Sequence, residues 1–296
     1  MGPAGAGPII MGEHSMKNIF TAASSVNLIR ALAATALGAA CLASVPARAD
    51  DRPEDRADKA AGTSDSSLTA TTGIDYSRGD YGTPSDTEIL VVPLSLRYKT
   101  GQLRLTATMP WLRIDGSSAI VGDGAGGVVI DPNAPRTVRS GFGDLTLGAA
   151  WAIPEERLGL GLDLSARVKL PTAKASRGLG TGATDVTLGA EVSKQLGAVT
   201  PFVNVGYRMP GDAPGINLHN AWTASGGASV MLGRSVLIAS YDYRQATSPF
   251  SQDSQELFGA FSTPVGQRLN FTLYGSAGLS KGAPDFGVGS MIGVRF

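Results

Sequence analysis

The sequence contains little cysteine, little histidine and, after its first 50 residues, no long apolar run. One cysteine and two histidines in 296 residues exclude the common cysteine- and histidine-rich metal sites, and no cofactor is expected. The formal net charge is zero, so the basic surplus of a nucleic-acid-binding protein is missing. No stretch of about 18 uncharged apolar residues follows position 50, which excludes a transmembrane helix there. A membrane-spanning β-barrel remains compatible with this composition, because barrel strands present only alternate residues to lipid.

Groups for acid–base catalysis are scarce as well. Beyond the N-terminal region the sequence offers one histidine, His219, with Ser225 a short distance further on. On a strand the two side chains would share a face, but roughly 20 Å of extended chain would separate them. A serine from another strand could still approach His219. The residues therefore favour a protein that has no catalytic site and is not an enzyme.

Residues 1–49 predict a cleavable signal peptide. Lys17 and Arg30 precede an apolar run over 31–44, and Ala47-Arg48-Ala49 forms a small-x-small cleavage site. This order of a charged region, an apolar region and small residues is typical of an exported protein.

Three further features belong to this N-terminal region. A start at Met16 would give a signal of ordinary length, so residues 1–15 could be an overextended gene start. Cys41 permits a lipoprotein reading, but Gly38 stands where a lipobox has leucine, so plain cleavage is favoured. Residues 50–66 are polar and show no periodicity. We interpret them as a flexible periplasmic lead-in.

Glycine is abundant, at 39 of 296 residues, compared with a usual share of about 7%. Glycine suits tight turns and closely spaced strands, and residues 67–296 show the matching period-two pattern in twelve segments. The most regular one places leucine, alanine or valine at every second position from Leu158 to Leu170. The segments lie at 68–77, 90–99, 103–111, 144–151, 158–170, 183–194, 199–209, 221–232, 236–244, 255–263, 268–279 and 286–296.

The last segment is the most informative about fold. Phe286, Val288, Ile292 and Val294 occupy one face, and the chain ends on that face with Phe296. A final strand without fraying is explained if it pairs with the first strand of a closed barrel. The ending resembles the C-terminal aromatic signature of bacterial outer-membrane proteins, so Phe296 is the expected assembly signal for the barrel-assembly machinery. The predicted fold is all-β, a transmembrane antiparallel up-and-down barrel of twelve strands over 67–296.

The connections between the segments alternate in length. With the N-terminus in the periplasm, the short ones become periplasmic turns and the long ones become extracellular loops, as in known barrels. The longest, 113–140, could fold inward as a constriction or lie on the surface. Pro93 and Pro201 each remove a ladder hydrogen bond, and bulges are expected at both.

Aromatic residues fall at the segment ends, as membrane-interface girdles require. The core of a soluble sandwich would be the alternative, and the export signal and the uncharged apolar faces oppose it. The expected outer rim comprises Trp111, Tyr207, Trp222 and Tyr243, and the expected inner rim comprises Tyr98, Trp151 and Phe296.

Charged residues concentrate on the face opposite the apolar one, where acids and bases nearly balance. Strong charge selectivity is therefore not expected. A lumen of twelve strands is intermediate in width, so paired charges could line a narrow polar path or fill it as a structural network. The lumen candidates are Asp75, Arg97, Arg104, Asp144, Asp163, Arg167, Lys169, Asp185, Glu191, Arg208, Asp242, Arg244, Glu256, Arg268 and Arg295.

Four segments carry a family resemblance: Gly141–Trp151 (GFGDLTLGAAW), Ala166–Ala173 (ARVKLPTA), Gly178–Gly197 (GLGTGATDVTLGAEVSKQLG) and Phe202–Arg208 (FVNVGYR). They resemble the outer-membrane barrel family labelled for the MetA pathway of phenol degradation. Ala173 stands where that family more often has glycine. The resemblance implies an outer-membrane channel for small, often aromatic or apolar, compounds, and it brings no catalytic residues.

Two functional hypotheses follow. The first is passive uptake or efflux of small organic molecules through a monomeric barrel that contacts outer-membrane lipid, lipopolysaccharide and the barrel-assembly machinery. The second is a non-conducting structural or surface-interaction barrel whose lumen is plugged by its charges. The sequence does not identify the solute.

Overall fold

The structure, a computed structural model, describes residues 66–296 with gaps at 118–119, 123–126, 130–134, 213–214 and 216. The predicted signal peptide at 1–49 lies outside the described residues, as does all of the predicted polar segment except Ser66. Within the described ranges no helix is both long and apolar enough to cross a membrane. The described chain is almost entirely strand.

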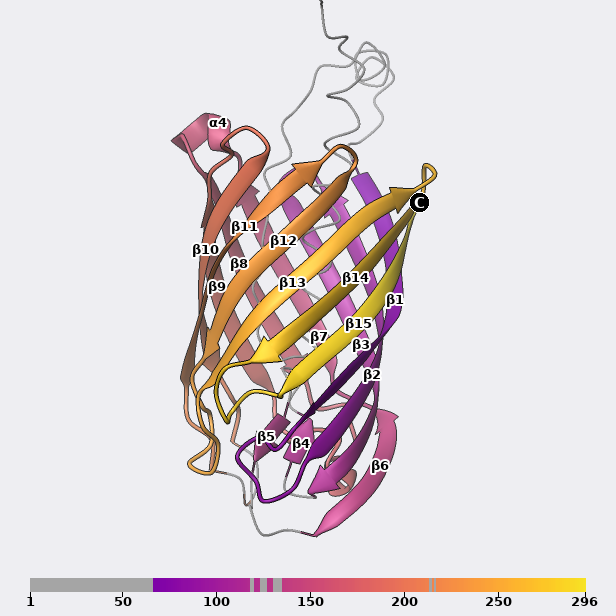
Figure 1. Cartoon of the computed structure of the whole chain (residues 1–296), viewed down its shortest axis with the longest axis vertical. Helices are drawn as coiled ribbons and strands as arrows, with labels where there is room; N and C mark the ends of the chain where they lie inside the picture. Colours follow the sequence, from indigo (N-terminus) through magenta and orange to yellow (C-terminus); the bar gives the residue numbers. More distant parts are fainter. Residues whose placement is uncertain (1–65, 118–119, 123–126, 130–134, 213–214, 216) are drawn as a thin grey trace, which may run out of the picture.

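Twelve strand positions form one closed antiparallel wall (Figure 1). The wall closes because β1 pairs with both β2 and β15, and β6 and β7 share one position since both pair with β3. Closure pairs the strands of the wall on both sides, as a lipid environment requires; among the described strands of the wall β6 alone pairs on one side only, with β3. The predicted twelve-stranded barrel is confirmed. Its strands are β1 (Ser66–Gly79), β2 (Thr87–Thr100), β3 (Leu103–Ser117), β6 (Arg136–Phe142), β7 (Leu145–Ile153), β8 (Gly161–Leu170), β9 (Asp185–Ser193), β10 (Val199–Met209), β11 (Ala221–Leu232), β12 (Ser235–Arg244), β13 (Ser254–Val265), β14 (Leu269–Gly278) and β15 (Phe286–Arg295).

Short connections gather at one end of the barrel, the turn end, and long connections at the other, the loop end (Figure 1). This is the alternation that the sequence predicts. The turn-end connections are 101–102, 154–160 with the helical turn α4 (Glu155–Leu158), 194–198, 233–234 and 266–268. The loop-end connections are 80–86, 118–135 with the hairpin of β4 (Ile120–Gly122) and β5 (Gly127–Val129), 171–184 with the 3₁₀ turn η1 (Ala175–Arg177), 210–220, 245–253 and 279–285.

Alternate residues of each strand face outward and inward. In β1 the side chains of Leu68 and Ile74 are exposed on the outer surface, whereas Asp75 and Ser77 are fully buried. The same alternation of exposed apolar and buried polar residues continues to β15. This is the inverse of a soluble protein and is the arrangement expected when lipid contacts the outer surface.

Three predicted boundaries are wrong. A strand is predicted from Leu158, but Pro154 and the left-handed Gly159 bracket the turn α4, so β8 begins only at Gly161. Arg268 is predicted to begin a strand and lies instead in the turn before β14.

The predicted loop 113–140 is shorter than expected, because β3 continues to Ser117 and β6 begins at Arg136. This polar β3–β6 extension needs no alternating apolar residues, which is why the sequence pattern does not reveal it.

The bulges predicted at Pro93 and Pro201 are also absent. The register of β2 with β3 runs unbroken through the pair Pro93 and Pro110, and that of β10 with β11 runs unbroken through Pro201 and Ala228. Each proline therefore takes its place in the ladder without an inserted residue.

A bulge does occur between β6 and β7. The registers of β3 with β6 and with β7 differ by one residue, and the extra residue lies at Gly143–Asp144, opposite Pro110. Gly143 N–H donates to the carbonyl of Pro110 at 2.8 Å. A bulge locally redirects side chains next to functional positions, and this one places Asp144 among the inward residues.

Aromatic residues lie on the outer surface near both ends, as the sequence predicts. At the loop end the rings of Tyr207 and Trp222 pack at a centroid distance of 4.7 Å, and those of Tyr76 and Phe286 pack at 6.1 Å. At the turn end the exposed aromatic residues are Tyr98, Trp151 and Phe296.

Two contacts reinforce the seam where β1 meets β15. The backbone N–H of Phe296 donates to the carbonyl of Leu68 at 2.8 Å, so the chain terminus is part of the ladder. On the inner side, the Tyr274 hydroxyl donates to Asp75 Oδ2 at 2.9 Å. The Tyr274 ring lies over Gly289 of β15, where a Cβ atom would collide with it. Glycine at this position allows the Tyr274 side chain of β14 to cross β15 and reach Asp75 of β1.

Candidate functional site

The lumen is the candidate site, and the strands bring most of the predicted charged residues into it. Nine of them are buried: Asp75, Arg97, Asp144, Asp163, Lys169, Asp185, Glu191, Arg208 and Glu256. Four are partly buried on the inner face: Arg104, Arg167, Asp242 and Arg244. Arg268 and Arg295 are exposed at the turn end.

A first charged group lies toward the turn end. Arg104 of β3 forms an ion pair with Asp163 of β8, and the Asp163 side chain is fully buried. Glu191 of β9 stands opposite Asp163 in the ladder, and Arg97 of β2 lies close enough to interact with both Arg104 and Asp163. Two arginines and two carboxylates balance, so this group gives the lumen no net charge.

A second polar group lines the inner side of the seam. Asp75 accepts a hydrogen bond from Tyr274, and Ser77 bonds the hydroxyl of Tyr81 at 3.2 Å. Glu256 accepts a hydrogen bond from Ser254 at 3.0 Å. The group is largely acidic, and its two carboxylates accept hydrogen bonds from Tyr274 of β14 and from Ser254 on the same strand as Glu256.

A third group lies toward the loop end and is centred on Lys169 of β8. Lys169 Nζ donates to Asp144 Oδ2 at 3.0 Å and to Thr181 Oγ1 at 2.8 Å, and it lies 3.5 Å from Asp185 Oδ2. Arg208 donates to the same Asp185 oxygen at 2.7 Å. All four charged side chains are almost completely buried. Two cations and two anions in such a setting are stable only as a set, because removing one leaves a buried charge unpaired.

This third group fastens the connection 171–184 inside the loop end. Asp144 Oδ1 accepts the backbone N–H of Ala173 at 2.9 Å, and Thr172 Oγ1 accepts that of Leu145 at 2.8 Å. Residues 179–181 are buried, whereas 174–177 are exposed. A Cβ atom at Gly180 would lie 2.6 Å from Asp144 Oδ2. The connection therefore dips into the barrel at 179–181 instead of extending away from it.

An apolar cluster packs beside this connection on the inner side of the barrel wall. Its members come from the inner faces of β2 and β3 and from two loop-end connections: Tyr81, Ile89, Val91, Leu112, Ile114 and Leu179, with Ala173 packed against them. Tyr81 has a left-handed backbone, with φ of 50°, and burial raises the pKa of its phenol. Such backbone strain in a non-glycine residue persists only where packing compensates it.

A second apolar cluster lies on the opposite wall. It contains Phe202, Val236, Ile238, Ala260, Tyr274 and Met291. The inner face is thus not uniformly polar, contrary to the sequence interpretation of a lumen defined by its charges.

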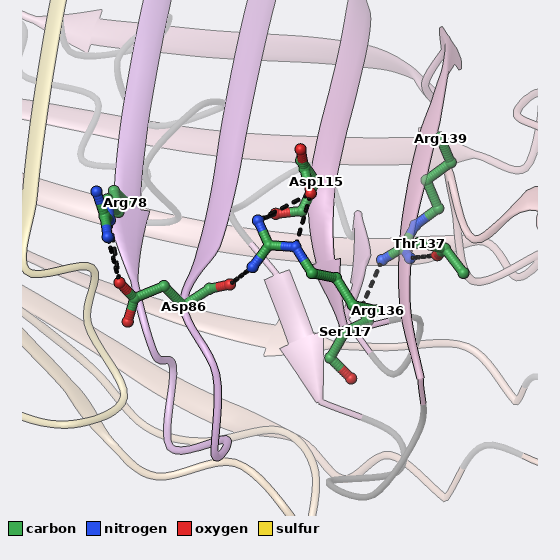
Figure 2. Close-up of polar contacts among 7 residues, drawn as sticks. All are labelled: Arg78, Asp86, Asp115, Ser117, Arg136, Thr137 and Arg139. Atoms are coloured by element: carbon green, nitrogen blue, oxygen red, sulfur yellow. Dashed lines mark hydrogen bonds and ion pairs between the residues drawn. The ribbon is translucent and has the colours of Figure 1, made fainter.

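The β3–β6 extension is held at the loop end by a row of ionic contacts (Figure 2). Arg136 of β6 donates to Asp115 Oδ1 and to the carbonyl of Asp86, both at 2.9 Å, and Arg78 donates to Asp86 Oδ2 at 2.7 Å. Figure 2 shows Arg139 apart from this row, where it contacts Thr137 and the carbonyl of Ser117.

Arg139 and Gly141 of this extension also approach the connection 171–184. A Cβ atom at Gly178 would lie 3.1 Å from Arg139 Nε, and one at Gly141 would lie 2.8 Å from Leu179 Cδ1. The extension therefore supports 171–184 from the side that the Lys169 group does not reach.

The candidate catalytic residues do not come together. His219 is exposed before β11, and its Nδ1 lies 3.2 Å from the carbonyl of Asn220. Ser225 is buried on the inner face of β11. In the part of the chain that the structure describes, no group of three histidine, cysteine or acidic side chains could hold a metal ion.

The apolar half of the site and the inward connection 171–184 do not follow from the sequence pattern. One signal was available, because Ile89-Leu90-Val91-Val92 is apolar on both faces of its strand. Tyr274 and Leu179 carried no such signal. Their inward positions depend on which strands and loops become neighbours.

The four segments that carry the family resemblance meet at the Lys169 group. Gly141–Trp151 supplies Asp144, Ala166–Ala173 supplies Lys169, Gly178–Gly197 supplies Asp185, and Phe202–Arg208 supplies Arg208.

Several solved structures share the fold. An outer-membrane channel from Pseudomonas putida F1 superposes with a TM-score of 0.61 at 17% identity, covering 78% of this chain and 95% of that chain. The translocator domain of the autotransporter NalP from Neisseria meningitidis gives 0.47 at 14% identity over 82% and 95%. The CymD monoaromatic hydrocarbon channel gives 0.40 at 12% identity over 78% and 87%. The first of these establishes the outer-membrane β-barrel fold.

The sequence comparisons address family membership directly. No curated protein matches the sequence. A protein-family model matches residues 53–296, which include every strand of the barrel. The chain therefore belongs to the family described as "Putative MetA-pathway of phenol degradation".

Proposed function

We propose that this protein is a passive outer-membrane channel for small organic molecules that carry an aromatic or apolar part. The observation that carries the proposal is the apolar cluster of Ile89, Val91, Leu112 and Ile114 on the inner face of β2 and β3. These side chains are buried in the structure. A lumen that passes only water-soluble ions has no use for such a cluster, whereas an apolar solute that displaces part of it gains free energy by contacting the rest. The family description and the channel fold agree with this role.

The charged groups of the lumen support a weakly selective path for charge. Arg104 is paired with Asp163, and Lys169 and Arg208 are paired with Asp144 and Asp185. A balanced lining exerts no net attraction on ions of either sign. Selection would therefore depend on the size and apolar character of the solute, and a passive channel would serve uptake or efflux according to the gradient.

The proposal includes the protein's location and state. Residues 1–49 act as a signal peptide cleaved after Ala49, and the barrel is a monomer in the outer membrane, assembled through its C-terminal strand. It catalyses no reaction. The exposed apolar residues from Leu68 to Ile292 would contact lipid, and the loop end would face lipopolysaccharide. Mass spectrometry of the purified protein tests the cleavage site directly.

A non-conducting barrel is the second candidate, and one observation favours it. Nearly all inward polar side chains of the described residues are buried, including Asp75, Asp163 and Glu191. A permanently filled lumen would show this packing. The two candidates make opposite predictions for solute flux.

Flux into proteoliposomes separates the candidates. Benzenesulfonate and gluconate carry the same charge, and benzenesulfonate stays ionised and leaks slowly through lipid, so their comparison reports the effect of the aromatic ring. We expect benzenesulfonate to enter faster than gluconate, and Leu112→Asn to reduce this preference, with Leu112→Met as the matched apolar control. Flux equal to that of protein-free vesicles for every solute would establish the non-conducting barrel instead.

A further inference from the structure

We propose that residues 171–184, the gate loop, form a gate at the loop end that is latched shut by Lys169 and opened by the solute. The inference rests on the proposed channel function and adds its regulation. The gate loop enters the barrel at 179–181 and returns to the wall at Asp185. Its buried tip carries Leu179, which is itself a member of the apolar cluster.

The latch consists of a few polar contacts. Asp144 holds the gate loop by two routes, directly through Ala173 N–H and indirectly through Lys169, whose Nζ also donates to Thr181. Outside these contacts and that of Thr172, the gate loop is held by the apolar packing of Ala173 and Leu179 and by the β3–β6 extension, which approaches Gly178 and Leu179. A small number of bonds at one place can break together, which is the property a gate needs.

The glycines of the gate loop fit this role. Gly178 and Gly182 flank the buried tip and have left-handed backbones, with φ of 65° and 77°. Gly180 lies so close to Asp144 that no side chain fits in the closed state. The exposed 3₁₀ turn η1 precedes the tip and makes no buried contact. Movement of 178–182 thus requires no rearrangement of a barrel strand.

Leu179 couples the gate to the solute. In the closed state its side chain is 2% exposed and completes the apolar cluster with Ile89 and Leu112. Withdrawing Leu179 exposes apolar surface, which is unfavourable unless an apolar solute takes its place. A solute that binds the open state better shifts the equilibrium toward it. A polar solute of equal size would not, so the gate itself selects for apolar character.

The first experiment measures gate opening without measuring transport. The sequence has one cysteine, Cys41, outside the described residues, so in a Cys41→Ser background Leu179→Cys provides a single reporter whose labelling by a water-soluble maleimide requires opening. Thr181→Val removes one hydrogen bond to a charged amine, and we expect labelling of the reporter to accelerate about tenfold or more. Thr108→Val is the matched control, because Thr108 is equally buried on β3 and bonds Ser95 instead. Equal labelling rates in all three proteins would overturn the proposal.

The second experiment locks the gate. Asp144 Cγ lies 2.9 Å from the position of a Cβ atom at Gly180, close to the spacing across a disulfide. In Asp144→Cys/Gly180→Cys, made with Ala173→Gly to give space, oxidation should abolish benzenesulfonate flux and a reductant should restore it above the wild-type rate. The Ala173→Gly protein and each single cysteine variant serve as controls.

The two proposals fail differently. If wild-type protein passes no solute but Thr181→Val still accelerates labelling, the gate stands and the channel function falls. If wild-type protein passes benzenesulfonate and the oxidised double-cysteine variant passes it equally well, the channel function stands and the gate falls.

Discussion

Gly289 offers the sharpest test of how the barrel closes. It lies on the inner face of β15, directly beneath the Tyr274 ring, which crosses it to bond Asp75 on β1. Gly289→Ala places a methyl group where the ring lies. The ring must move, and Asp75, which is fully buried, then loses its bond to Tyr274.

The magnitude follows from two effects. Losing a hydrogen bond to a charged group costs about 1.5–3 kcal/mol, and forcing a methyl group into a packed site costs about 1–3 kcal/mol. Gly289→Ala should therefore lower the free energy of unfolding by about 3–5 kcal/mol. Tyr274→Phe loses only the hydrogen bond and should lie between this variant and the wild-type protein.

Urea unfolding in lipid vesicles measures these differences. Gly226→Ala is the matched control, because Gly226 lies on β11 with nothing within 4 Å of an added Cβ atom. We expect this control to unfold like the wild-type protein.

A double-mutant comparison isolates the contact. In a Tyr274→Ala background Gly289→Ala should cost almost nothing, since the colliding ring is gone. An unchanged stability of the single variant Gly289→Ala, or a full cost in the Tyr274→Ala background, would refute the contact.

Three further predictions concern other parts of the barrel. Arg104→Met leaves Asp163 buried without its ion-pair partner and should destabilise the barrel by about 3–5 kcal/mol. Arg136→Met breaks a pair whose side chains are 48% and 29% exposed and should cost less than about 1 kcal/mol. Similar urea midpoints for the two variants would contradict the assignment of the Arg104 pair as buried. Deleting Phe296 should reduce the fraction of folded barrel, seen as heat-modifiable migration on gels, while the molecules that assemble keep wild-type solute flux; normal assembly would show that the terminal residue carries no signal. Leu94→Lys places a charge on the lipid-facing surface and should destabilise the barrel by about 2–4 kcal/mol if the residue lies at the bilayer midplane. Leu232→Lys, near a strand end, should be tolerated. Equal effects of the two variants would argue against the membrane placement of the barrel.

The family resemblance and the period-two pattern correctly predicted the barrel. Strand alternation is local, because each side chain points to one face or the other irrespective of distant neighbours. Leu68 and Asp75 could therefore be assigned to opposite faces of β1 from the sequence. The same rule predicts that the charged residues on the opposite face point inward, and Arg268 and Arg295 are exposed at the turn end instead.

Predictions of bulges at single prolines and of the structure of polar segments were less successful. Pro93 and Pro201 sit in unbroken registers, while the bulge occurs across from Pro110. Which proline requires a bulge depends on the direction in which its missing N–H would point, toward one neighbouring strand or the other. The polar residues 136–140 form a strand because β3 lies beside them. Neither fact is present in the local pattern.

The candidate site shows the same division. By itself the sequence determined the twelve strands, their inner and outer faces and the balance of charge in the lumen, since these follow from side-chain type and a period of two. Only the tertiary structure decided that Lys169 bonds Asp144 and Thr181, that Leu179 completes an apolar cluster, and that Tyr274 reaches Asp75 over Gly289. These contacts join segments that are far apart in the chain. They stabilise the protein only after the barrel has closed, because closure determines which segments become neighbours.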